Sequence, residues 1–235
     1  MTLFILAIWG WAAGAALLFG GFLVLGQTHD EGTRRVPTWA RMALSLTLVA
    51  LGWLGYAEAH GVPALLLALG MTLGSVGDFI LAGIIPLRPS LIGGIIAFGL
   101  GHAAYITGLF LCGNEHHWAA SAPRWGAIIV WLAFAALAWF VVVQRGAHLT
   151  PLRLAALPYA LLLATTAGAA LGLALQAPPL IPAAIGGALF VVSDFLLAAQ
   201  QFRQARFPLI SDVVWLTYAP AQLLILTAIA ACAGL

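Results

Sequence analysis

Two aspartates stand inside stretches of the sequence that otherwise carry no charge. Asp78 lies in "GDFILAG" (residues 77–83) and Asp194 lies in "SDFLLAA" (residues 193–199). An ionised aspartate in the middle of a membrane-spanning helix costs roughly 2.5–3.5 kcal/mol on insertion scales. The chain must recover this free energy through a partner, a water-filled cavity or protonation. Two carboxyl groups that face one cavity tend to share a proton, as a general acid and its charged companion do.

Further polar side chains follow each aspartate at helical spacing. His102 and Tyr105 are three residues apart, and Tyr218 and Gln222 are four residues apart, so each pair shares one helix face. Ser193 stands next to the second aspartate. Gathered in one cavity, these side chains and the two acids form a polar site near the middle of a membrane.

A small-residue stripe accompanies the first aspartate. Gly70, Gly74 and Asp78 recur every four residues, which places them on one side of a helix and lets a neighbouring helix approach closely. A structural alternative stays open for the polar residues, because His102 could bond a neighbouring carbonyl and the tyrosines could hold helices together. Asp212 is interpreted as a charge at a helix start, where the helix dipole favours it.

The sequence lacks the residue patterns that are typical of several classes of enzyme. Only His102 of the six histidines lies inside an apolar segment, so a three-histidine zinc centre is not expected. The sequence contains no GxSxG elbow and no glycine-rich phosphate loop. We therefore expect a site without metal or cofactor.

The composition is that of an integral membrane protein. The 235 residues are 63% hydrophobic and 7% charged, with a mean hydropathy of +1.07. In soluble domains about a quarter of all residues are charged. The formal charge of +2 is too small to indicate a nucleic-acid partner.

Apolar stretches long enough to span a membrane, about 20 residues each, recur along the whole chain. They predict eight spans, at residues 2–25, 39–59, 62–84, 89–112, 124–144, 152–175, 180–202 and 209–233. Their short connections leave no room for a soluble domain. The predicted fold is therefore an all-α bundle of eight transmembrane helices, with residues 1–235 forming a single transmembrane domain.

The arginines predict the orientation of this bundle. Only Arg124 flanks an even-numbered connection, whereas the other eight arginines flank odd-numbered ones. Because basic residues favour the cytoplasmic side, both termini are expected outside the cytoplasm, as in a protein of a bacterial inner membrane.

The sequence also indicates an internal repeat. Asp78 and Asp194 are 116 residues apart, and the same offset pairs Gly70 with Gly186 and His102 with Tyr218. Parallel four-plus-four repeat halves are therefore predicted at residues 1–118 and 119–235. Two cysteines, Cys112 and Cys232, fall near the predicted outer face; their spacing favours unpaired thiols over a disulfide.

The chain resembles a known family in four segments, which occur in this order: "GDFILAG", "FGLGHAAYI", "GALFVVSDFLLAAQQF" and "LTYAPAQLLI". It resembles the YhhN/TMEM86 family of lysoplasmalogenase-like membrane proteins over nearly its whole length. This resemblance implies hydrolysis of the vinyl ether bond of a lysoplasmalogen, which yields a fatty aldehyde and a glycerophospho-alcohol. The expected partner is a lysophospholipid substrate within the bilayer.

Vinyl ether cleavage gives roles to the candidate residues. Protonation of a vinyl ether carbon leaves an oxocarbenium ion that water attacks, and paired carboxyl groups serve such a reaction in glycoside hydrolysis. The resemblance thus implies that Asp78 and Asp194 are catalytic and that His102 orients an acid or relays a proton. Four further residues are expected to hold the acids, the water or the glycerol oxygens: Tyr105, Ser193, Tyr218 and Gln222.

The substrate phosphate is expected near arginines such as Arg88, Arg203 or Arg206. Two other functions stay open at this point. Buried acids in a duplicated bundle also suit a proton-coupled transporter, and a lipid-binding membrane protein is the remaining alternative.

Overall fold

A computed structural model describes residues 2–146 and 148–234 of the chain. Within these residues, eight helices are long and apolar enough to cross a membrane, which confirms the all-α, eight-span prediction. The long helices are α1 (Thr2–Leu25), α2 (Thr38–Ala59), α3 (Val62–Leu81), α4 (Ser90–Glu115), α5 (Ser121–Ala138), α6 (Pro151–Ala174), α7 (Ile181–Arg203) and α8 (Ile210–Leu226).

Four short elements complete the described part of the chain. They are η1 (Asp30–Gly32), η2 (Trp139–Gln144), η3 (Pro178–Leu180) and α9 (Ala228–Cys232). The element η2 continues α5 as a π-helical turn and belongs to the same span. The predicted last span is interrupted, because α8 ends at Leu226 and α9 begins at Ala228. At the junction the Thr227 hydroxyl donates to the carbonyl of Leu224, a local bond that competes with regular helix geometry.

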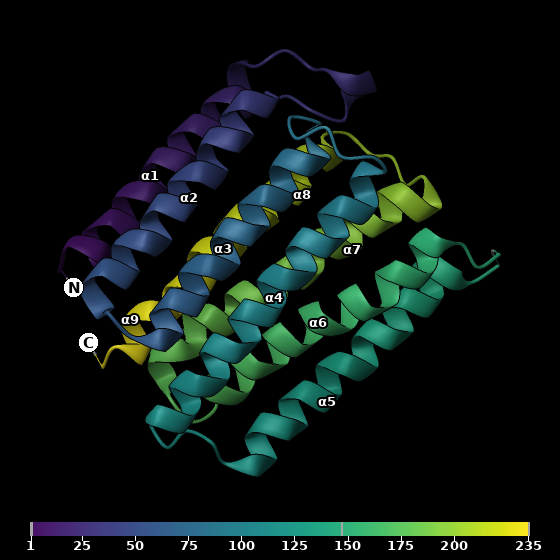
Figure 1. Cartoon of the computed structure of the whole chain (residues 1–235). Coiled ribbons are helices and arrows are strands. Elements are labelled where there is room, and N and C mark those ends of the chain that lie inside the picture. Colours follow the sequence, from purple (N-terminus) through teal and green to yellow (C-terminus); the bar gives the residue numbers. More distant parts are fainter. Residues whose placement is uncertain (1, 147, 235) are drawn as a thin grey trace.

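The helices lie side by side as an antiparallel bundle (Figure 1). The α1–α2 pair forms one edge, and α5 lies toward the opposite edge. The start of α1 and the end of α9 lie at one end of the bundle, whereas the connecting residues 26–37, 82–89, 145–146, 148–150 and 204–209 lie at the other. We call this second end the arginine-rich end.

Local sequence signals explain several helix ends. Proline stands in the first turn of α3, α6 and α7, where its missing N–H is not needed. The hydroxyl of Thr150 caps α6 by accepting a hydrogen bond from the amide of Arg153. His60 and Gln204 end α2 and α7 in the left-handed conformation (φ of 55° and 53°).

The glycine stripe on α3 permits the close helix contacts that the sequence predicted. A Cβ added at Gly70 would lie 2.4 Å from the ring of Tyr105 on α4. A Cβ added at Gly74 would lie 3.0 Å from Nε2 of Gln222 on α8. The two glycines therefore bring side chains of α4 and α8 against the helix that carries Asp78.

The prediction of two unpaired cysteines is wrong. Cys112 on α4 and Cys232 on α9 form a disulfide, with their Cα atoms 5.3 Å apart. Although 120 residues separate them in sequence, α9 packs beside α4. The bond joins these elements at the end of the bundle opposite the arginine-rich end.

Candidate functional site

A single polar cavity contains both aspartates in its wall. Its volume is about 380 Å³. Asp78 is 6% exposed and Asp194 is half-buried. Asp30, an exposed residue of the arginine-rich end, also lines the cavity. The two acids thus face a common space that reaches from the bundle interior toward that end.

Asp78 is held by two hydroxyl groups from two other helices. Ser45 on α2 donates to its Oδ2 at 2.6 Å, and Tyr218 on α8 donates to the same oxygen at 2.9 Å. No described residue donates to Oδ1. The carboxyl group is therefore fixed through one oxygen while the other is available for water or substrate.

A hydrogen-bonded chain extends from Asp78 toward the bundle interior. Gln222 donates through Nε2 to the hydroxyl of Tyr218 (3.2 Å) and accepts at Oε1 from the hydroxyl of Tyr105 (2.7 Å). Tyr105, Tyr218 and Gln222 are all buried. The structure therefore connects three of the predicted substrate-binding residues to one aspartate, where they act as its support.

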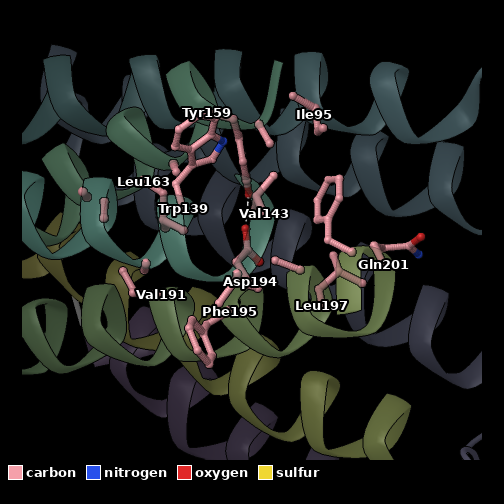
Figure 2. Close-up of a pocket in the computed structure, with 18 of the residues that line it drawn as sticks. Ile95, Trp139, Val143, Tyr159, Leu163, Val191, Asp194, Phe195, Leu197 and Gln201 are labelled. Atoms are coloured by element: carbon pink, nitrogen blue, oxygen red, sulfur yellow. Dashed lines mark hydrogen bonds between the residues drawn. The ribbon is translucent and has the colours of Figure 1, made fainter. Parts of the chain in front are cut away.

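Asp194 has a separate donor, the hydroxyl of Tyr159 on α6, which bonds its Oδ2. Figure 2 shows the two side chains pointing toward each other between α6 and α7. As at Asp78, no described residue donates to Oδ1. Both acids thus share one arrangement, with one oxygen held by hydroxyl donors and one left open.

A second, apolar pocket of about 120 Å³ adjoins this point. It lies among α4, α5, η2, α6 and α7, and residues such as Trp139, Val143 and Phe195 line it (Figure 2). Tyr159 and Asp194 belong to its wall as well as to the wall of the polar cavity. The hydrogen-bonded pair therefore stands where an apolar space and a polar space meet.

His102 is placed differently from the sequence prediction. It is 1% exposed, and its Nδ1 lies 3.1 Å from the hydroxyl oxygen of Thr166. The centre of its ring lies 4.8 Å from the ring centre of Phe190 and 5.7 Å from that of Tyr159. Within the described residues it makes no hydrogen bond to either aspartate and does not line the cavity, so its predicted proton relay has no direct route here.

Ser193 lines the polar cavity, but its hydroxyl donates to the backbone carbonyl of Val214 on α8 at 3.1 Å. This bond joins α7 to α8 next to Asp194. The structure thus places Ser193 beside the site with its donor already used.

Asp212 is not the ordinary helix-start charge that the sequence suggested. It is fully buried, and its Oδ1 pairs with Nη2 of Arg41 on α2 at 2.6 Å. Its carboxylate also accepts the backbone amides of Arg35 (2.6 Å) and Val36 (3.2 Å). The helix dipole alone does not explain this burial; Asp212 joins the start of α8 to the start of α2.

With this geometry in place, comparison with known proteins identifies the family. The YhhN family model matches residues 36–229. The chain belongs to the YhhN family. No curated protein and no solved structure matches it. The YhhN match begins before α2 and includes both aspartates with all their hydroxyl donors, whereas α1 lies outside it.

Three residues of this YhhN site were not found from the sequence. Ser45 and Tyr159 supply hydroxyl donors to the acids, and Arg41 lines the polar cavity. The one available signal was the spacing of Arg41 and Ser45, four residues apart at the start of an apolar span. Tyr159 follows a proline in its span and carries no comparable pattern.

Proposed function

We propose that this YhhN protein is an intramembrane hydrolase that cleaves the vinyl ether bond of lysoplasmalogens such as lysoplasmenyl-ethanolamine and lysoplasmenyl-choline. The products are a fatty aldehyde and a glycerophospho-alcohol. The observation that carries the proposal is the position of Asp194, which lines an apolar pocket and also the polar cavity that contains Asp78.

This position matches the chemistry of the substrate. A lysoplasmalogen has one hydrocarbon chain, a polar glycerophosphate group, and its reactive double bond at the junction between them. The apolar pocket suits the chain and the polar cavity suits the headgroup. The reactive bond then lies beside Asp194.

In the first step, we assign the proton donor to Asp194. The carbon that accepts the proton is the vinyl carbon attached to the alkyl chain, and Asp194 is the acid that borders the chain pocket. Transfer of the proton from its carboxyl group to that carbon leaves an oxocarbenium ion and a carboxylate. The carboxylate then stabilises the positive charge that has formed next to it.

In the second step, we assign activation of water to Asp78. Its Oδ1 accepts a proton from water while the hydroxide oxygen bonds to the carbon that carries the ether oxygen. The resulting hemiacetal breaks its bond to the glycerol oxygen, which takes the hemiacetal proton, and the aldehyde is released. A proton returned from Asp78 to Asp194, through cavity water, restores the starting state.

The proposal includes a duplicated architecture with the arginine-rich end in the cytoplasm. Gly70 packs against Tyr105 in the first half. In the second half Gly186 packs against Ala221, since a Cβ added at Gly186 would lie 2.7 Å from the carbonyl oxygen of Ala221. Both partners are 35 residues after their glycine. These equivalent contacts support the 116-residue repeat.

The test is aldehyde release from lysoplasmenyl-ethanolamine by the purified protein. Wild-type protein should release aldehyde, and Asp78→Asn and Asp194→Asn should each abolish it. Glu115→Gln is the matched control, because Glu115 is exposed at the far end of the bundle. Full activity in either aspartate variant contradicts the mechanism. Lipid-dependent acidification of proteoliposomes without aldehyde release would instead indicate a proton-coupled transporter.

A further inference from the structure

The geometry points to a phosphate-binding site at Arg41, in the wall of the polar cavity. We propose that Arg41 binds the headgroup phosphate of a single-chain phospholipid and so sets the preference of the cavity for lipids with a phosphate over single-chain lipids that lack one. This inference rests on the proposed function, because it places the headgroup in the cavity that contains both aspartates.

Arg41 is a buried cation in the wall of the polar cavity. The residue is 8% exposed, yet it lines the polar cavity together with Asp78 and Asp194. Burial of a guanidinium is costly unless hydrogen bonds and opposite charges compensate it. A charged side chain retained in a cavity wall inside a membrane span is by default a candidate for ligand binding.

The guanidinium is held by two side chains of α8. Its Nη2 donates to Asp212, and its Cζ lies 5.8 Å from the centre of the Trp215 ring. Asp212 is itself fixed by two backbone amides of the α1–α2 connection. The orientation of Arg41 is therefore set before any ligand arrives.

The other donors of Arg41 are unused. Arginine carries five N–H donors in a planar fork that matches the oxygens of a phosphate. Within residues 2–146 and 148–234, no acceptor bonds its Nε or Nη1, and its Nε is buried without a partner. A phosphate oxygen in the cavity would supply the acceptor that the protein does not.

The spacing along α2 agrees with the length of the headgroup. Arg41 and Ser45 are four residues apart, so they share a helix face and are separated by about 6 Å along the axis. Ser45 donates directly to Asp78. In a lysoplasmalogen only a glycerol unit separates the phosphate from the vinyl ether, which is a comparable length.

The arginines expected from the sequence to bind phosphate lie elsewhere. Arg203 donates to the carbonyl oxygens of Val141 and Arg145, and Arg206 pairs with Glu31 at 2.6 Å. Neither lines the cavity of the two aspartates, nor does Arg88. Arg34 does line it, but its Nε pairs with Asp30 at 2.8 Å near the opening.

The test measures binding and is independent of turnover. Lysophosphatidylethanolamine, which has an ester in place of the vinyl ether, and monoacylglycerol of the same chain are titrated into detergent-solubilised protein. Wild-type protein should bind the phospholipid on the order of 10- to 100-fold more tightly, the range expected for hydrogen bonds to a charged group. Arg41→Gln with Asp212→Asn should bind both lipids equally, and Arg41→Lys should keep part of the preference.

Two controls separate this site from a structural role of the ion pair. The double substitution removes both charges and leaves no unpaired carboxylate, and its thermal denaturation reports whether the bundle is intact. Arg206→Gln, at an arginine with a 73% exposed side chain, should keep the wild-type preference. A purely structural role for Arg41 would weaken binding of both lipids alike.

The outcomes are distinct. Equal binding of the two lipids by wild-type protein, or a preference retained in the folded double variant, would overturn the proposal. Competition by inorganic phosphate alone as strong as that by the phospholipid would overturn its assignment to a lipid headgroup. If the wild-type and variant proteins show the expected lipid preferences but release no aldehyde from a vinyl ether, the phosphate site is supported and the proposed hydrolase is refuted.

Discussion

Tyr159 and Asp194 form a hydrogen-bonded pair that lines two spaces, an apolar pocket among α4, α5, η2, α6 and α7 and a polar cavity that reaches the arginine-rich end. A chain that places a carboxyl group at such a boundary can present it to the junction of an amphiphilic molecule. The hydroxyl donor determines which oxygen of the acid remains available.

Loss of the Tyr159 hydroxyl should therefore impair catalysis more than stability. We expect Tyr159→Phe to lower kcat for aldehyde release about 10- to 100-fold, because a hydrogen bond to a charged group is lost. Tyr56→Phe is the matched control; Tyr56 packs against Trp53 and His60 away from the cavity. Equal kcat values for the two variants would show that Tyr159 does not position Asp194.

Ser45 is expected to play the same part for Asp78. Removal of its hydroxyl in Ser45→Ala leaves Tyr218 as the only described donor to that carboxyl group. Steady-state kinetics should show a lower kcat with little change in KM, because Ser45 contacts the acid and does not line the cavity. Ser121→Ala, at an exposed position of α5, should behave as wild type. An unchanged kcat in Ser45→Ala would remove Ser45 from the site.

The apolar pocket should determine which chain lengths are accepted. Ala138 lines it, so Ala138→Phe adds a ring to the space available for the alkyl chain. We expect a shift of kcat/KM toward shorter chains, measured by competition between a short-chain and a long-chain lysoplasmalogen. The matched control is Ala136→Phe, at an exposed position on the same helix that does not line the pocket. The chain would have to lie elsewhere if both variants kept the wild-type preference.

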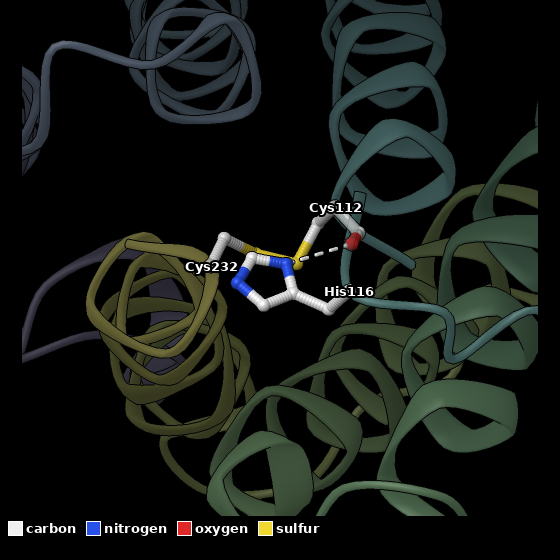
Figure 3. Close-up of a disulfide and its surroundings, with 3 residues drawn as sticks. All are labelled: Cys112, His116 and Cys232. Atoms are coloured by element: carbon white, nitrogen blue, oxygen red, sulfur yellow. Dashed lines mark hydrogen bonds between the residues drawn. A yellow bond between two sulfur atoms is a disulfide. The ribbon is translucent and has the colours of Figure 1, made fainter. Parts of the chain in front are cut away.

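The disulfide should contribute to stability and leave the site intact. Figure 3 shows Cys112 bonded to Cys232 beside His116, at the end of the bundle away from the cavity. Disulfides typically stabilise by about 2–4 kcal/mol, so Cys112→Ser with Cys232→Ser should denature at a lower temperature in detergent. Aldehyde release should persist below that temperature. Coincident denaturation curves for wild-type and variant protein would mean that the bond adds no stability.

Much of the fold was predictable because the membrane limits the choices. Eight apolar stretches predict eight helices, since only hydrogen-bonded helices or closed barrels can cross a bilayer. The stripe of Gly70, Gly74 and Asp78 also predicted a close helix contact beside an acid. These features depend on residue type and on spacing within one helix, which a sequence contains directly.

The missed features depend on which helices become neighbours. Ser45 and Tyr159 show no distinctive pattern within their own helices. They become part of the site because α3 and α7 place an aspartate within hydrogen-bond distance of them. The disulfide likewise requires α9 to lie beside α4. The Arg41–Asp212 pair carried a further signal besides the spacing of Arg41 and Ser45, because a charged residue at the start of a membrane span usually has a partner.

The most direct measurement of the central claim is the isotope content of the product. Lysoplasmenyl-ethanolamine is hydrolysed in D₂O, and the aldehyde is trapped at once and analysed by mass spectrometry. Protonation of the vinyl carbon by Asp194 predicts one deuterium on the carbon next to the aldehyde group, and no product from Asp78→Asn or Asp194→Asn. Aldehyde without that deuterium, or full turnover in either variant, would contradict carbon protonation by the paired aspartates.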